Sequence, residues 1–251
     1  MRMSLLLFAF FAVAAFPAQQ SVDADPWLQH FFDYSREYRR RLPSLACDES
    51  MVLQRVKNGK VKWEVHVETT LREIRDETKS DEFKDNYSFK TVNGKPPKAH
   101  FTVPYFVHGA FANALGAGME RACFDYRVAS IENGATIQIN VDSRPNLSDP
   151  ACQDLPRELH KMVLVDASFG AVKHVERSIS QEFSDKHHDV PFVSVDFAPQ
   201  TLGNQTLWLP VRYEASDAGK QGHEVATYSN FHRFVGEVKI VPDAPVLEVR
   251  P

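Results

Sequence analysis

Alternation of apolar and polar residues constrains the fold of this chain more than any other feature. From Lys60 to Thr69, apolar side chains occupy every second position, as Val61, Trp63, Val65 and Val67. Successive side chains of a strand point to opposite faces, so this period of two predicts a half-buried strand. Asn58-Gly59, directly before it, tolerates the positive φ of a tight turn, so we expect residues 51–56 to pair antiparallel with residues 60–67.

The same pattern recurs along the rest of the chain. We expect a second hairpin from residues 123–131 and 136–142 around Glu132-Asn133-Gly134, and a third from residues 161–165 and 171–180 around a turn that Gly170 closes. Further alternation predicts strands at residues 193–197, 207–213, 225–228 and 235–241. Short turns leave no room for the crossovers that parallel strands need, so these segments, roughly ten strands, predict an antiparallel meander.

Two segments break the alternation. Apolar residues recur every three or four positions in residues 27–42, with Asp25 as a candidate N-cap and Pro43 as a stop, which predicts one amphipathic helix. Residues 104–118 are small and apolar and predict a short helix or plug whose Phe106 and Phe111 face the sheet. An apolar sheet face must be covered by a second layer, which here means these helices or a ligand.

The N-terminal residues predict export. Arg2 precedes an apolar run at residues 5–16 that Pro17 interrupts. At ~1.5 Å per residue such a run is too short to cross a ~30 Å hydrocarbon layer, so a secretory signal peptide is favoured over a retained membrane anchor. With cleavage after Ala18, residues 1–18 are the signal peptide and residues 19–251 form a single β-rich domain, not membrane-spanning, that is periplasmic or secreted.

An exported protein meets an oxidising compartment, so its three cysteines favour one disulfide and one free thiol. Cys123 and Cys152 lie near the open ends of two strands joined by a turn, which predicts that they pair. Cys47 is then a partly buried thiol among apolar neighbours. No two cysteines have Cys-x-x-Cys spacing, so a metal site is not predicted from them.

The charged and catalytic residue types form no recognisable site. Basic and acidic side chains number 29 and 33 without a long run of like charge, which argues against a nucleic-acid partner. No nucleophile elbow, zinc-protease motif or phosphate-binding loop is present, so we expect no enzyme activity, no cofactor and no metal. The strand triplet Glu64, His66 and Glu68 is interpreted as a solvated face, and His187-His188-Asp189 as a loop; these histidines are where a catalytic or metal site would first be sought.

Two passages carry a family resemblance: residues 160–172, His-Lys-Met-Val-Leu-Val-Asp-Ala-Ser-Phe-Gly-Ala-Val, and residues 207–211, Leu-Trp-Leu-Pro-Val, running into residues 226–234, Ala-Thr-Tyr-Ser-Asn-Phe-His-Arg-Phe. They resemble uncharacterised exported proteins of soil bacteria, of acidobacterial type, whose architecture is similar to the LolA/LolB lipoprotein carriers. The resemblance implies a curled antiparallel sheet that forms a half-open barrel, with helices over its concave apolar face. In the carriers, the cavity between sheet and helices holds acyl chains.

We therefore expect the inward-facing side chains to bind a hydrophobic ligand such as a lipid or a lipoprotein acyl chain. The residues expected to line this face are Trp63, Val65, Val67, Phe106, Phe111, Ile137, Ile139, Val193, Val195 and Phe197. The alternative is a non-enzymatic scaffold or interaction module in which the same side chains form a packed core without a ligand.

Overall fold

The computed structural model describes residues 25–75, 83–98, 101, 121–144, 152, 158–180, 182, 184, 186, 191–217 and 222–233. Several predictions fall outside these residues: the signal peptide, the plug at residues 104–118 with Phe106 and Phe111, the His187-His188 pair and the strand at residues 235–241.

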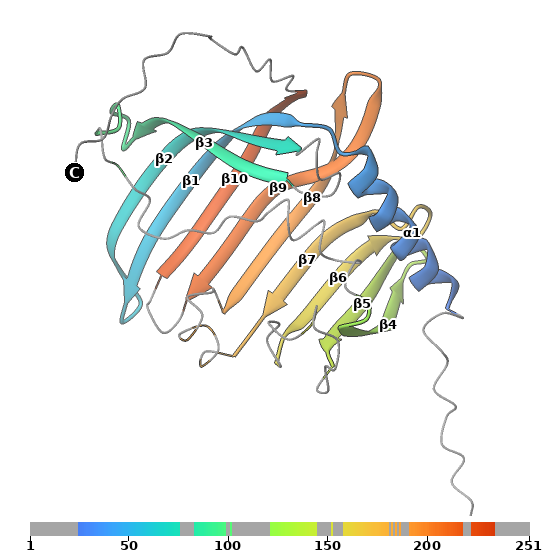
Figure 1. Ribbon diagram of the computed structural model, residues 1–251. Coiled ribbons are helices and arrows are strands. Elements are labelled where there is room, and N and C mark those ends of the chain that lie inside the picture. The colour runs from blue at the N-terminus through green and yellow to red at the C-terminus, as the bar shows by residue number, and fades with distance from the viewer. Residues whose placement is uncertain are drawn as a thin grey trace, which may run out of the picture.

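One helix and ten strands make up the described chain (Figure 1). The helix is α1 (Pro26–Arg41). The strands are β1 (Leu45–Lys57), β2 (Lys60–Arg75), β3 (Phe83–Val92), β4 (Phe124–Glu132), β5 (Thr136–Ser143), β6 (His160–Asp166), β7 (Val172–Ser178), β8 (Phe192–Leu202), β9 (Gln205–Asp217) and β10 (Gly222–Arg233). All ten belong to a single antiparallel sheet, which is curled and unclosed, so the predicted fold class is confirmed.

The predicted hairpins are present. Asn58 and Gly59 have φ of 53° and 69° in the β1–β2 turn, and Asn133 and Gly134 repeat this at 50° and 66° in the β4–β5 turn. Both turns therefore use the left-handed backbone that Asn and Gly tolerate. Strand β3 was not predicted, because it is rich in charged and polar residues, as strands at a sheet edge commonly are.

The strand order differs from a consecutive meander. It is β3-β2-β1-β10-β9-β8-β7-β6-β5-β4, so the last strand returns to pair with the first, and β3 and β4 form the two opposite edges. A meander in chain order would have placed β3 beside β4. Local turns specify only which strands pair within each hairpin, whereas the β1–β10 pairing brings together segments from the two ends of the chain.

Helix α1 packs on the inner face of the sheet at one end of the strands (Figure 1). The Asp25 side chain accepts hydrogen bonds from the backbone N–H of Trp27 at 2.9 Å and of Leu28 at 3.3 Å, which confirms the predicted N-cap. At the other end, the Arg75 guanidinium of β2 donates to the carbonyl oxygens of Arg39, Arg40 and Leu42 at 3.0–3.1 Å. No helix in the described part of the chain is long and apolar enough to cross a membrane.

The predicted disulfide joins Cys123 to Cys152, with their Cα atoms 5.4 Å apart. Cys47 is free, as expected, and it is fully buried. Burial raises the pKa of the Cys47 thiol well above its usual value, and the nearby carboxyls of Glu49 and Asp48 act in the same direction. The thiol is therefore protonated and unreactive at neutral pH, and it packs as a small apolar side chain.

Candidate functional site

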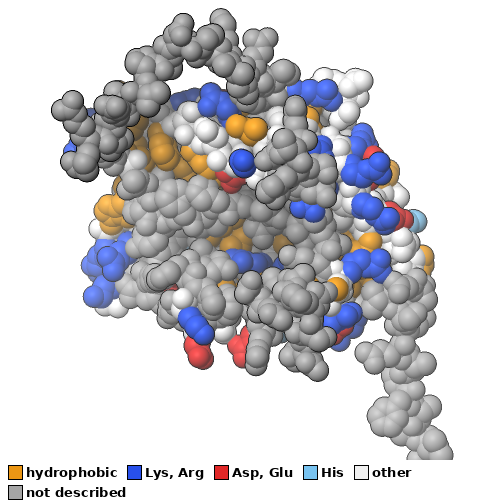
Figure 2. All heavy atoms as spheres, in the orientation of Figure 1, with side chains coloured by type: hydrophobic (Ala, Val, Ile, Leu, Met, Phe, Trp, Pro, Cys, Tyr) orange, Lys and Arg blue, Asp and Glu red, His pale blue; other side chains and the backbone are white. Residues whose placement is uncertain are grey.

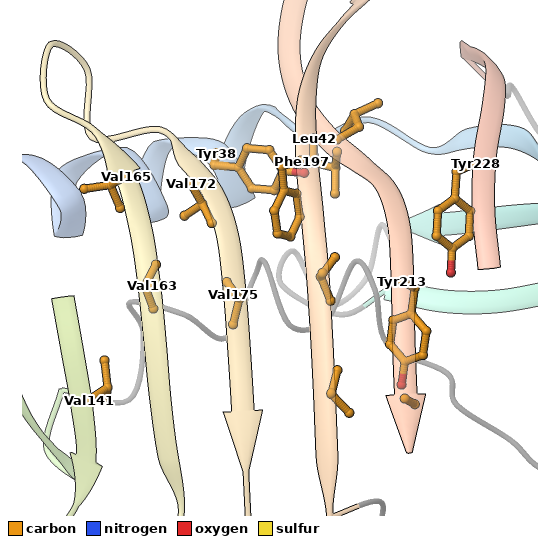
Figure 3. Close-up of a cluster of buried hydrophobic side chains, with 14 of the residues drawn as sticks. Tyr38, Leu42, Val141, Val163, Val165, Val172, Val175, Phe197, Tyr213 and Tyr228 are labelled. Carbon is orange, nitrogen blue, oxygen red and sulfur yellow. The ribbon is translucent and has the colours of Figure 1, made fainter. Parts of the chain in front are cut away.

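A row of apolar side chains crosses the inner face of the sheet from one edge to the other. The pairing register aligns, in order, Val128, Ile139, Val163, Val175, Val195, Tyr213, Ala226, Met51, Val67 and Val92. Ile139, Val163, Val195 and Val67 have no exposed surface. Neighbouring members stand side by side in Figure 3, as Val163 and Val175 do. The sheet therefore presents one continuous apolar surface inward.

Most of the predicted inward residues lie on this surface. Val67, Ile139 and Val195 belong to the row itself, and Val65, Ile137, Val193 and Phe197 are buried close to it. Trp63 differs, because it is 37% exposed. Alternation places it on the same face as Val65, but it lies close to the β1–β2 turn, beyond the covered part of the sheet.

Three carboxyl groups interrupt the inner face at the end formed by β10, β1 and β2. Glu49, Glu73 and Glu224 are only 2–4% exposed, and Oε2 of each has no hydrogen-bond partner within the described part of the chain. Glu49 pairs in register with Tyr228, while Glu73 pairs with Asp85 of β3. Sequence reasoning missed this cluster, although the alternation carries the signal: Glu49 has the same parity as Met51, and Glu73 the same as Leu71.

Burial sets the ionisation of these groups. Desolvation, together with the hydrogen bond and negative charge of Asp85, raises the pKa of Glu73 to about 10. Burial also raises the pKa of Glu224 to about 8, with a further contribution from Glu49. The pKa of Glu49 itself rises to about 7, since a hydrogen bond from Tyr228 partly offsets its desolvation. Near neutral pH, Glu73 and most of Glu224 are uncharged carboxylic acids, which both donate and accept hydrogen bonds.

Helix α1 covers the inner face along one end of the strands, from β4 to the end of β2. Phe31 and Phe32 pack against Tyr126 of β4, with ring centroids 6.2 and 4.9 Å apart. Tyr38 lies beside Phe197 (Figure 3), next to a cavity of about 10 Å³ that Val172 and Trp208 also line. That volume is about the space of one water molecule. At this end, helix and sheet are closely packed.

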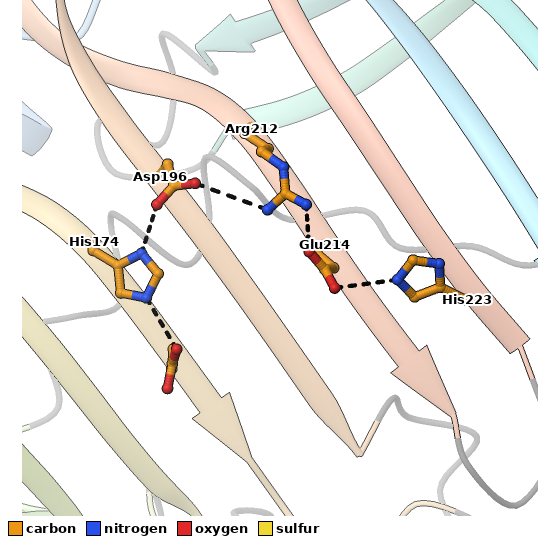
Figure 4. A network of polar contacts seen from close by, with 6 residues as sticks. His174, Asp196, Arg212, Glu214 and His223 are labelled. Atoms are coloured by element: carbon orange, nitrogen blue, oxygen red, sulfur yellow. Dashed lines mark hydrogen bonds and ion pairs between the residues drawn. The ribbon is translucent and has the colours of Figure 1, made fainter.

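The outer face of the sheet is polar. A chain of charged side chains crosses β7 to β10: His174 contacts Asp196 at 2.7 Å, Arg212 links Asp196 to Glu214, and Glu214 contacts His223 at 3.1 Å (Figure 4). Opposite charges directly across neighbouring strands stabilise a solvated sheet surface. In the described residues, no group of three or more His, Cys, Asp or Glu side chains is arranged to hold a metal ion.

The triplet predicted as a solvated strand face lies on this outer face as well. Glu64, His66 and Glu68 are exposed, and each carboxylate has a local partner. Glu64 accepts from Gln54 at 2.6 Å and contacts His66 at 2.9 Å, while Glu68 accepts from Ser50 at 2.8 Å. These side chains therefore form separate local contacts on the outer face and do not converge on one point.

No protein-family model and no curated protein matches the chain. Among solved structures, it is similar to a DUF1329 family protein from Desulfovibrio piger, with 9% identity, a TM-score of 0.49 and coverage of 84% of this chain and 94% of that one. It is also similar to a LolA superfamily protein from Nitrosomonas europaea (12% identity, TM-score 0.40, coverage 85% and 96%). A putative outer membrane lipoprotein-sorting protein domain from Vibrio parahaemolyticus follows (9% identity, TM-score 0.37, coverage 81% and 92%). Likeness at this level carries no information on ligand or activity.

Proposed function

We propose that this protein is an exported, non-enzymatic binding protein that holds a hydrophobic ligand, such as a lipid or a lipoprotein acyl chain, on the inner face of its sheet. The observation that carries the proposal is the apolar row that runs without a break across all ten strands of an unclosed sheet. An acyl chain needs a long, continuous apolar surface, and an unclosed sheet leaves its inner face open to a second layer.

The buried carboxyl cluster supports an amphiphilic ligand rather than a plain hydrocarbon. Glu49, Glu73 and Glu224 each have an oxygen without a hydrogen-bond partner among the described residues, at one end of the apolar surface. A buried polar atom without a hydrogen bond costs free energy, so a ligand whose polar end meets these oxygens gains affinity there. The apolar chain of the same ligand would lie along the row toward β5 and β6.

A packed core without any ligand is the second candidate. It is favoured by the close packing of α1 on the sheet, where the cavity beside Tyr38 has a volume of only about 10 Å³. In this case the inner face contributes stability alone, and the protein acts through its surface as a scaffold.

Mass spectrometry of the organic extract from protein purified out of its native compartment separates the two candidates. A stoichiometric lipid in the extract supports the proposed binding of a hydrophobic ligand. The delipidated protein should then bind a fluorescent fatty acid. Repeated absence of lipid, together with failure to bind the fatty acid, would establish the packed-core alternative.

Two matched variants test whether the inner face is the site. Val195→Phe adds volume in the middle of the apolar row, whereas Glu176→Gln changes a half-exposed side chain on the outer face of neighbouring β7. We expect Val195→Phe to weaken fatty-acid binding at least several-fold while Glu176→Gln binds as the parent does. Thermal melting of both variants checks that the fold is retained. Equal binding by the two variants would place the ligand elsewhere.

A further inference from the structure

The tip of the β1–β2 hairpin, residues 55–63, combines positive charge with exposed apolar side chains. Arg55, Lys57, Lys60 and Lys62 lie within these nine positions without an acidic residue. Residues 57–63 are all exposed, and among them Val61 is 51% and Trp63 37% exposed. Figure 2 shows blue basic side chains with orange apolar ones directly beside them at the left edge of the molecule, the side on which Figure 1 places this turn.

We propose that this hairpin tip docks on the surface of an anionic lipid bilayer, with Trp63 and Val61 entering the headgroup region and the four cations contacting lipid phosphates. The proposal goes beyond the ligand-binding role of the inner face, because the tip would bind a bilayer whether or not the inner face is occupied.

The charges of the tip are available for such a partner. None of the four cations has a hydrogen bond or ion pair with a described residue. The acidic residue that follows the tip, Glu64, is engaged by Gln54 and His66 on the outer face. The whole chain has a formal net charge of −4, so an anionic surface repels it on average and attracts it at a local basic cluster.

The apolar side chains favour a bilayer over a nucleic acid. Phosphate binding to nucleic acids depends on clustered cations, and an exposed Val between them adds nothing to it. Trp is enriched at the membrane–water interface, where its ring is apolar on one side and hydrogen-bonded on the other. Basic residues flanking an exposed Trp and Val therefore match the headgroup boundary of an anionic membrane.

The backbone of the tip also suits a protruding contact. Arg55 pairs with Trp63 and Val56 with Val61, so Lys62 is the extra residue of a β-bulge. A bulge increases the local twist and turns the end of the hairpin away from the plane of the sheet. Asn58 and Gly59 close the turn in two residues, so the tip is short and ordered by its strand pairing.

The chain supplies a natural control at the other end of the sheet. Phe169, in the β6–β7 turn, is 64% exposed, more than Trp63. Its turn carries Asp166, whose carboxylate contacts Lys173, and has no comparable basic cluster. Figure 1 places this turn opposite the β1–β2 tip. If exposed apolar surface alone drove binding, Phe169 would contribute as much as Trp63.

Co-sedimentation with vesicles tests the proposal. The full mature chain should bind vesicles of phosphatidylcholine mixed with phosphatidylglycerol, and its binding should weaken strongly at high salt and on phosphatidylcholine alone. Each basic residue near an anionic surface changes affinity about fivefold, so Lys60→Gln/Lys62→Gln should bind roughly 25-fold more weakly. Trp63→Ala should lose roughly eightfold, the effect of removing about 50 Å² of apolar burial.

Two controls complete the design. Arg36→Gln/Arg40→Gln removes the same charge from the exposed face of α1, and Phe169→Ala removes the other exposed aromatic ring; both should bind within about twofold of the parent. Unchanged melting temperatures confirm that each variant is folded. Equal loss in the α1 variant, no loss in the tip variants, or no binding to anionic vesicles would overturn the proposal. Binding to DNA that the Lys variant loses and Trp63→Ala keeps, without vesicle binding, would identify a polyanion site instead.

Discussion

Replacing Gly170 with alanine should destabilise the protein more than any other glycine substitution in its described turns. Gly170 closes the β6–β7 turn with φ of +71°, and its N–H donates to the Asp166 carbonyl at 2.8 Å. A Cβ added there would lie 2.5 Å from the carbonyl oxygen of His30 and 3.0 Å from the backbone nitrogen of Phe31. Both atoms belong to the backbone of α1, which cannot rotate away as a flexible side chain would.

The expected magnitude has two parts. A left-handed backbone costs alanine about 1 kcal/mol relative to glycine. Restoring an ordinary contact distance requires α1 and the turn to separate by about 1 Å, and such overpacking costs typically about 1–3 kcal/mol. The sum is about 2–4 kcal/mol, which corresponds to a fall in melting temperature of roughly 5–12 °C for a domain of this size.

Gly203→Ala provides the matched control. Gly203 has φ of +65° in the β8–β9 turn, but a Cβ there would meet no atom within 4 Å. This variant should therefore lose only the backbone part, about 1 kcal/mol or 2–4 °C. Thermal unfolding measures both variants, and hydrogen exchange should show faster exchange in α1 for Gly170→Ala alone. Indistinguishable melting temperatures for the two variants would refute the close approach of α1 to the turn.

Three further predictions concern other parts of the fold. Below about pH 4.5 the folded and unfolded proteins both hold the Glu224 proton, and between about pH 4.5 and 8 only the folded protein holds it, so wild-type stability falls as pH rises through this window. Glu224→Gln removes that loss. Urea titrations should therefore show that the free energy of unfolding of the variant, relative to that of wild type, is roughly 2–4 kcal/mol greater at pH 8 than at pH 4.5. A difference that does not change with pH would contradict the raised pKa of Glu224. Arg75→Met removes three hydrogen bonds to the last turn of α1 and should cost about 1–3 kcal/mol, whereas Arg36→Gln on the exposed face of α1 should cost under about 0.5 kcal/mol. Cys123→Ser/Cys152→Ser opens a loop with a sequence separation of 29 and should cost about 3–4 kcal/mol, while wild type under reducing conditions should show the same loss.

Much of this architecture could be predicted from local pattern. The period of two identifies the inner face of β2, with Val65 and Val67, and the Asn-Gly turns specify which strands form hairpins. The Asp25 N-cap and the three- to four-residue spacing identify α1. These features follow from the sequence because each depends on residues close together in the chain, where backbone geometry and side-chain direction set the pattern.

The tertiary structure alone decided how those pieces combine. Pairing of β1 with β10 joins the two ends of the chain, and no local turn encodes it. The same pairing places Tyr228 beside Glu49 and sets Glu224 near them, which creates a buried carboxyl cluster from residues that alternation only assigns to a face. Trp63 shows the opposite outcome: its pattern matches that of Val65, yet its position near the turn leaves it exposed. Burial depends on what other parts of the chain cover, and that is a property of the assembled sheet rather than of the period of any one strand.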